Sequence, residues 1–180
     1  MGDKNYIYYA EGQCEEKLLE VLKTDMQLIR PGKISKYNVI QEKLKMAQLR
    51  TLKKGTTAVL VFDTDTTDNT NILKENIDIL KKYSAISNVI CITQVENLED
   101  EIVRSCDVSK AQELTNSKSV SSFKSDFIKA LNTAIGDAFF SVTYMEKNYK
   151  MYAGTPTYPV YSAVNGLPCY VGVGVDLIEQ

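Results

Sequence analysis

Runs of apolar residues alternate along this chain with segments in which apolar residues recur at helical spacing. Residues 5–10 (NYIYYA), 57–62 (TAVLVF) and 88–93 (NVICIT) are rich in apolar and β-branched side chains and predict strands. Between them, helices are predicted by Leu18, Leu19 and Leu22 and by Leu73, Ile77 and Leu80. Strands of this continuously apolar kind, alternating with helices, predict parallel β-α-β units that are buried on both faces.

Weaker signals predict the remaining elements. Residues 37–40 have the composition of a short strand, and residues 41–54 contain good helix formers that stop at Gly55, a residue typical of helix C-termini. Further helices are expected over residues 97–104 and, after a serine-rich stretch, over residues 122–133.

The composition changes at about residue 137. Residues 137–180 hold six of the 11 tyrosines and the hairpin-forming pair Asn165-Gly166. We therefore expect an α/β domain over residues 1–136 and a β-rich, tyrosine-rich C-terminal appendage over residues 137–180 that packs on it. Such an appendage can cover a face or edge of the sheet, or it can form an interface, including that of a homodimer.

Composition excludes several classes of protein. The longest aliphatic or aromatic run, residues 58–62, has five residues, whereas a transmembrane helix needs about 20. The chain enters its first strand without a secretory signal, so we expect a cytoplasmic protein with no membrane partner. It has no histidine, which excludes Ser-His-Asp triads and histidine zinc sites. Its four cysteines contain no C-x-x-C pair, and we expect them to be reduced.

Charge is distributed unevenly. The net charge is -2, but residues 30–55 contain eight basic residues and one acidic residue, a local charge of +7. Such a segment is either ordinary solvated surface or a patch that faces the phosphates of a nucleic acid. The candidates for nucleic-acid contact are Lys43, Lys45, Arg50, Lys53 and Lys54.

Acidic side chains follow each of the three clearest strands. Glu11-Gly12 follows the first, Asp63-Thr64-Asp65 follows the second, and Glu96 and Glu99 follow the third. Because parallel strands align their carboxyl ends, we expect these side chains to meet at one edge of the sheet. Two aspartates at i and i+2 in such a place suit a hard cation such as Mg2+, although the same residues can also cap the next helix.

The sequence resembles the Toprim fold of primases, topoisomerases, small ribonucleases and overcoming-lysogenization-defect nucleases. The resemblance rests on Tyr-Ile-Tyr-Tyr-Ala-Glu11-Gly12, a helix, the basic segment, and then Val-Leu-Val-Phe-Asp63-Thr-Asp65. Asn97-Leu98-Glu99-Asp100 resembles the additional acidic motif of the nuclease branch, which includes RloB-like and abortive-infection proteins. Over residues 5–134 this resemblance implies a Toprim-like (Rossmann-like) α/β fold, with a mainly parallel sheet and flanking helices.

The resemblance also implies an activity, which is Mg2+- or Mn2+-dependent phosphodiester cleavage of DNA or RNA, with a role in phage defence. Nuclease-branch relatives often work beside an ATPase, so a separate ATPase subunit is a further expected partner. The implied site residues are Glu11 (catalytic and metal-binding), Asp63 and Asp65 (metal-binding), Glu99 (a second metal, with Glu96 as the alternative), and Lys124 (catalytic, with Lys118 as the alternative).

Two other interpretations remain open. Asp63-Thr64-Asp65-Thr66-Thr67 matches the D-x-D-x-T signature of haloacid-dehalogenase-like phosphatases, in which the first aspartate is a nucleophile. That family places the motif near its N-terminus and follows it with a paired-aspartate motif, of which Gly136-Asp137 supplies only the beginning. The chain could also be a non-catalytic module that uses its tyrosine-rich appendage to bind a partner protein.

Overall fold

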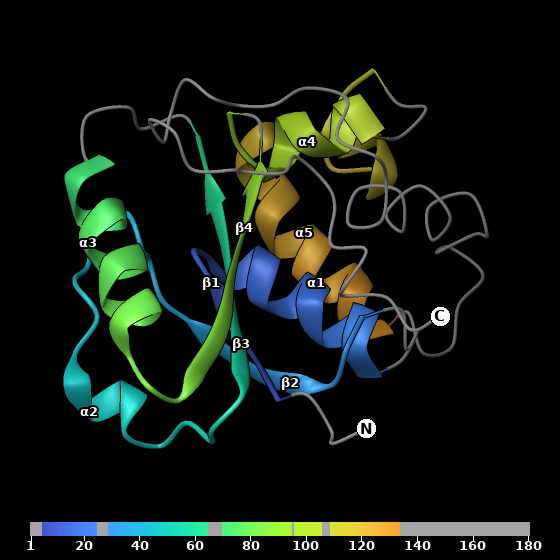
Figure 1. Ribbon diagram of the computed structural model, residues 1–180. Coiled ribbons are helices and arrows are strands. Elements are labelled where there is room, and N and C mark those ends of the chain that lie inside the picture. The colour runs from blue at the N-terminus through green and yellow to red at the C-terminus, as the bar shows by residue number, and fades with distance from the viewer. Residues whose placement is uncertain (1–4, 25–28, 65–69, 95, 106–108, 134–180) are drawn as a thin grey trace.

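Four parallel strands form one sheet at the centre of the protein (Figure 1). A computed structural model describes residues 5–24, 29–64, 70–94, 96–105 and 109–133. The strand order is β2-β1-β3-β4, so the expected α/β fold with a parallel, Rossmann-like sheet is confirmed. The elements are β1 (Tyr6–Ala10), α1 (Gln13–Thr24), β2 (Gly32–Lys36), α2 (Met46–Leu49), β3 (Thr56–Asp63), α3 (Thr70–Lys82), β4 (Ile86–Gln94), α4 (Leu98–Ser105), a 3-10 helix η1 (Ala111–Leu114) and α5 (Val120–Thr133).

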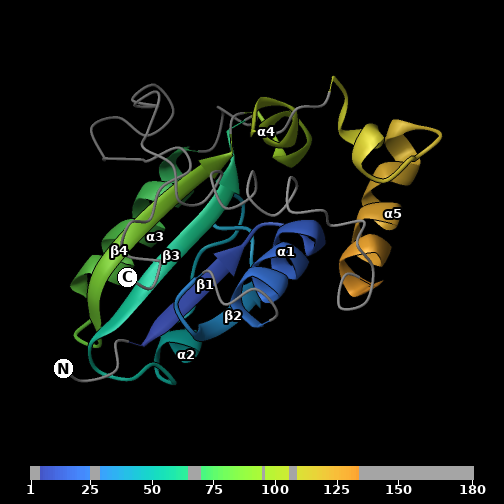
Figure 2. The same cartoon turned by 90° about the vertical axis from the view of Figure 1, so that its right-hand side faces the viewer.

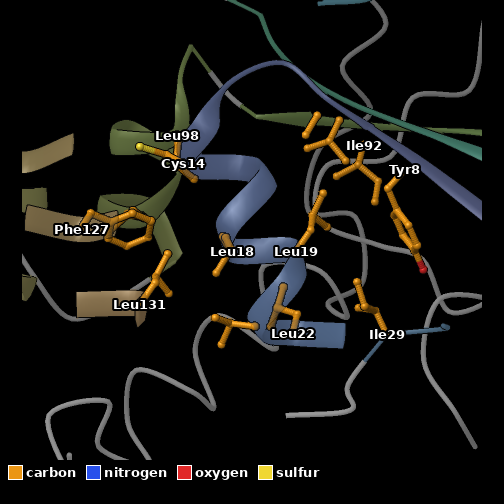
Figure 3. Packing of buried hydrophobic residues seen from close by; sticks show 14 of the residues in the cluster. Tyr8, Cys14, Leu18, Leu19, Leu22, Ile29, Ile92, Leu98, Phe127 and Leu131 are labelled. Atoms are coloured by element: carbon orange, nitrogen blue, oxygen red, sulfur yellow. The ribbon is translucent and has the colours of Figure 1, made fainter. Parts of the chain in front are cut away.

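Helices cover both faces of this sheet. One face is covered by α1, and α5 packs on α1 from the outside, while α3 covers the opposite face (Figure 2). Figure 3 shows how the side chains of Leu19 and Ile92 fill the space between α1 and the sheet, while Phe127 and Leu131 of α5 lie toward Leu18. The central strands therefore bury both of their faces, which explains why they read as continuous apolar runs.

The edge strand β2 pairs closely with β1. A Cβ atom added to Gly32 would lie 2.6 Å from the main-chain oxygen of Tyr6, a distance that real Cβ atoms do not adopt. The close approach of the two strands therefore requires glycine, which has no side chain, at position 32. Because β2 has a partner on one side only and half-exposed residues, its sequence lacks the apolar run that predicted the other strands.

Two expectations for the segment between β2 and β3 are wrong. Residues 37–40 are a turn and not a strand, because the Asn38 side-chain oxygen accepts hydrogen bonds from the main-chain N–H groups of Ile40 (3.0 Å) and Gln41 (2.9 Å). Residues 41–54 contain only the four-residue helix α2 instead of a helix along their whole length.

A buried asparagine of α3 explains the irregular path of this segment. Asn76 is fully buried, and its side-chain oxygen accepts a hydrogen bond from the Leu44 N–H at 2.7 Å. Its amide nitrogen donates to the main-chain oxygens of Val39 (2.8 Å) and Glu42 (2.7 Å). Since these contacts satisfy main-chain groups that a helix would otherwise pair, the segment can bury its apolar residues without regular structure.

The other elements for which a range was expected are observed within two residues of their expected bounds. The C-terminal appendage at residues 137–180, the domain boundary and the proposed dimer surface lie outside the described residues. Among the described helices, none is long and apolar enough to cross a membrane.

Candidate active site

The order of the strands marks one position at the edge of the sheet. The chain passes from β1 to β2 on one side and later to β3 on the other, so the direction of strand addition reverses between β1 and β3. Ligands of open parallel sheets bind outside the carboxyl ends of the strands at such a reversal. Glu11 follows β1 directly and Asp63 is the last residue of β3, so both carboxyl groups lie at this position.

Glu11 is joined to the end of β3 by its main chain and by its side chain. Its N–H donates to the Val61 main-chain oxygen at 3.2 Å, and its Oε2 accepts a hydrogen bond from the Asp63 N–H at 3.0 Å. The expected proximity of Glu11 and Asp63 is therefore observed. Asp63 ends β3, and α3 begins at Thr70. Asp65, the second expected ligand of this motif, lies outside the described residues.

Asn38 is a residue of this site that the sequence analysis missed. Its amide nitrogen donates to Glu11 Oε1 at 2.8 Å, and its side-chain oxygen is committed to the turn at residues 38–41. Both Glu11 oxygens thus accept a hydrogen bond, which fixes the orientation of the carboxylate. The available signal was the residue type, because asparagine is depleted in strands and enriched in turns that accept main-chain hydrogen bonds.

Glu15, one turn into α1, brings another carboxyl group to the same face of the sheet. Its side chain is 6% exposed, and burial raises its pKa, with smaller contributions from the negative charges of Glu11 and Glu99 that outweigh the attraction of Lys124. A Cβ atom added to Gly12 would overlap the Glu15 carboxylate, so this carboxylate folds back toward the end of β1. A buried carboxyl group among like charges is typical of functional sites.

Glu99 and Lys124 form an ion pair beside this cluster. Lys124 Nζ of α5 lies 3.5 Å from Glu99 Oε1 of α4. Partial burial acts against the charged form of Lys124, but attraction to Glu99, their hydrogen bond and the nearby Cys14 and Glu15 outweigh it, so its pKa is raised. Lys124 is therefore a cation at neutral pH and is not suited to act as a general base.

Cys14 does not supply a nucleophile to the site. Burial raises the pKa of its thiol to about 11, with a further increase from the Glu15 charge. Its Sγ lies 3.9 Å from the Lys124 main-chain oxygen, to which the thiol donates. The chemistry available at this edge is therefore that of carboxylates and one ammonium group, with Cys14 as a protonated core residue that joins α1 to α5.

The carboxylates at this edge are suitable ligands for a cation, although they are not gathered around one point. Within the described ranges, no three Asp, Glu or Cys side chains converge into a ready-made metal-binding group. The set still has the chemistry that Mg2+ and Mn2+ require, namely hard oxygen ligands held by rigid strand and helix ends. Burial is the main cause of the raised pKa of Glu15, and the charges of Glu11 and Glu99 add to it. A divalent cation would favour the ionised form of this carboxyl group. The residues therefore fit the expected metal.

The basic segment is not brought to the acidic edge as a unit. All five of its candidate residues are exposed, but Lys53 and Lys54 precede β3 and so lie at the opposite end of the sheet, near α2 (Figure 1). Lys43 pairs with Glu75 of α3 at 2.8 Å, on the face opposite to Glu15. Within the basic segment, Lys36 ends β2 at the carboxyl edge of the sheet, in register with Ala10, and its side chain is exposed.

Lys118, the alternative to Lys124, belongs to another part of the surface. It lines an open cavity of about 760 Å³ between η1 and the start of α5, together with Lys110, Glu113 and Ser119. The lining of this cavity shares no residue with the site at the sheet edge. The structure therefore places Lys124, and not Lys118, beside the carboxylates.

Comparisons of the chain with protein-family models, with curated proteins and with solved structures found no significant match.

Proposed function

We propose that the protein is a small Toprim-like nuclease that cleaves phosphodiester bonds of DNA or RNA with the help of Mg2+ or Mn2+. The observation that carries this proposal is the pairing of Glu11 with the end of β3 at Asp63, at the reversal point of the sheet. The Glu-Gly and Asp-x-Asp motifs that carry the Toprim resemblance thus start from adjacent strand ends. A role in phage defence and a separate ATPase subunit stay predictions.

Each residue of the candidate site has a role in the proposed reaction. Glu11, Asp63 and Glu15 would be drawn together on the metal, with Asp65 as a further ligand, and Glu99 would hold a second ion on the side of α4. A metal ion held there would supply positive charge against the phosphate and would make a water molecule easier to deprotonate near neutral pH. Asn38 keeps the Glu11 carboxylate in one orientation. Lys124 presents its ammonium group to the negative charge that develops on the phosphate oxygens.

The proposal is tested by incubating the purified chain with labelled single-stranded and double-stranded DNA and RNA under Mg2+ or Mn2+, with EDTA as the control. We expect metal-dependent cleavage that Asp63→Asn lowers by about 100-fold or more. As a matched control, Asp126→Asn changes a carboxylate that is bonded to Ser117 and paired with Lys129, away from the site, and should leave cleavage unchanged. Absence of cleavage with every substrate and both metals would refute the nuclease.

The same site distinguishes this proposal from a haloacid-dehalogenase-like phosphatase. Such an enzyme would use Asp63 as a nucleophile and form an aspartyl phosphate, and it would have no need of Glu11. The contact between Glu11 and Asp63 supports the Toprim-like alternative, because it makes Glu11 part of the same site. Hydrolysis of phosphate monoesters that survives Glu11→Gln, with trapping of an aspartyl phosphate, would favour the phosphatase.

A further inference from the structure

Gln94, the last residue of β4, has a buried side-chain amide that makes no hydrogen bond to any residue that the structure describes. The residue is 1% exposed, and both the nitrogen and the oxygen of its side chain lack a partner in this part of the chain. Its main chain, in contrast, is fixed, because its carbonyl oxygen accepts hydrogen bonds from the Thr64 N–H (3.1 Å) and the Thr64 hydroxyl (3.0 Å). Buried polar groups are nearly always paired in folded proteins, so an amide left in this state calls for an explanation.

The direction of this side chain follows from the register of the sheet. Gln94 pairs with Asp63, and the residues two positions earlier, Ile92 and Val61, both lie in the core beneath α1. Because side chains alternate along a strand and register partners share a face, Gln94 and Asp63 both project on the side of α1. This is the side on which Glu15 also lies, so the amide belongs to the same carboxyl edge as the acidic cluster.

The chemistry of the cluster shows what an amide adds to it. Ionised carboxylates only accept hydrogen bonds, and Glu11, Glu15 and Asp63 therefore offer no donor to an anionic group. The amide of Gln94 supplies two N–H donors without adding charge, and its donors do not titrate. A methionine or leucine at this place would avoid the cost of an unpaired buried amide, so the polar group is explained by a ligand that pairs with it.

We propose that Gln94 is a substrate-contacting residue whose amide nitrogen donates a hydrogen bond to a non-bridging oxygen of the phosphodiester group. This inference rests on the proposed nuclease function and assigns the phosphate contact to a residue outside the acidic motifs. The amide oxygen accepts from a water molecule or sugar hydroxyl next to the phosphate. A neutral donor on the same side of the sheet as the carboxylates gives the phosphate one attractive contact that is independent of the cation.

Two substitutions separate this role from a structural one. Gln94→Met keeps the size of the side chain and removes the unpaired amide. Thr93→Val is the matched control, because the Thr93 hydroxyl is also buried and unpartnered but lies on the opposite face, in register with Phe62. Both variants should unfold at a higher temperature than the wild type, since each removes an unpaired buried polar group. Only Gln94→Met should lose cleavage, by about 10- to 100-fold, the usual effect of a lost hydrogen bond to a charged group.

A third variant tests which end of the amide acts. Gln94→Glu keeps an oxygen acceptor but replaces the donor with a negative charge, so cleavage should fall at least as far as in Gln94→Met. Retained cleavage with tighter Mn2+ binding would instead make the side chain a metal ligand and would overturn the phosphate contact. Wild-type cleavage with an equally active Gln94→Met would overturn this inference alone. No cleavage by the wild type under any condition would overturn the nuclease and the phosphate contact together.

Discussion

Glu11 Oε2 accepts a hydrogen bond from the main-chain N–H of Asp63 at 3.0 Å, which ties the residue after β1 to the last residue of β3. The contact spans 52 positions of the sequence and crosses the reversal point of the sheet. Glu11 can therefore not move without disturbing the end of β3. Its carboxylate is both a structural acceptor and a candidate ligand, and substitutions have to be designed so that these two roles can be told apart.

The first prediction separates the two roles of Glu11 by reversing a hydrogen bond. Glu11→Gln replaces one oxygen with a donor that faces either Asn38 Nδ2 or the Asp63 N–H, so stability should fall by about 1–3 kcal/mol. Adding Asn38→Asp turns that partner into an acceptor while its other oxygen keeps the turn. The double variant should recover most of the stability in urea unfolding but remain about 100-fold less active in cleavage. Recovered cleavage would show that Glu11 is only structural.

The second prediction concerns the pH dependence caused by Glu15. The pKa of Glu15 is raised in the folded protein, so the folded state binds the carboxyl proton more tightly than the unfolded state does. The stability that this tighter binding provides is lost as pH rises above the usual glutamate pKa. Glu15→Gln should therefore melt higher than the wild type at neutral pH, on the order of a few degrees, with a smaller difference toward pH 4. Thermal unfolding at several pH values measures this.

Metal provides the control for this second prediction. The charges of Glu11, Glu99 and Lys124 act on Glu15 from the neighbouring elements. These charges are present in both the wild type and Glu15→Gln, so the difference between the two proteins isolates Glu15. Mn2+ should raise the melting temperature of the wild type more than that of Glu15→Gln. Equal metal responses in the two proteins would exclude Glu15 from the metal site.

The main strands were predictable because burial on both faces leaves a local signal. β1 and β3 are continuous apolar runs, and the helices α1 and α3 keep their apolar residues at helical spacing. The edge strand β4 keeps an apolar run in its middle, although its first five residues are partly or fully exposed. The segment from Asn38 to Leu52 could not be predicted in the same way. Its path depends on Asn76, a residue more than 30 positions away that satisfies its main-chain groups, and no local pattern carries that contact.

The residues of the candidate site also differ in whether a local sequence signal reveals them. Glu11, Asp63 and Glu99 could be found because each follows a strand, and strand ends are visible in the sequence. Asn38 and Gln94 could not be found, because their roles depend on their surroundings in space. Asn38 matters because its amide contacts the carboxylate of Glu11, and Gln94 because its side-chain amide is buried without a hydrogen-bond partner among the described residues. Charge counting also misplaced the basic residues, since residues 30–55 run from one end of the sheet to the other.

The third prediction compares two basic residues that lie at opposite ends of the sheet. Lys36 ends β2 beside the site, whereas Lys54 precedes β3 at the far end, and both are exposed. Lys36→Glu should weaken nucleic-acid binding and reduce the slope of log K against log salt by about 0.7 for a single-stranded ligand. Lys54→Glu makes the same charge change and should leave the slope unchanged. Equal effects in a fluorescence-anisotropy titration would assign binding to the whole segment.

The fourth prediction tests whether Lys124 serves the reaction or the fold. Its side chain is 68% exposed, so its ion pair with Glu99 contributes little to stability, and Lys124→Met should leave the melting temperature nearly unchanged. Cleavage should nevertheless fall, by about 10-fold or more, because the ammonium group no longer meets the phosphate charge. Since the pKa of Lys124 is raised, the pH–rate profile of the wild type should show no loss of activity from this group up to about pH 10. Lys129→Met is the matched control, because Lys129 lies on the same helix and pairs with Asp126 at 3.8 Å away from the carboxylates. If both variants keep full activity, or if both lose it equally, Lys124 has no specific role in cleavage.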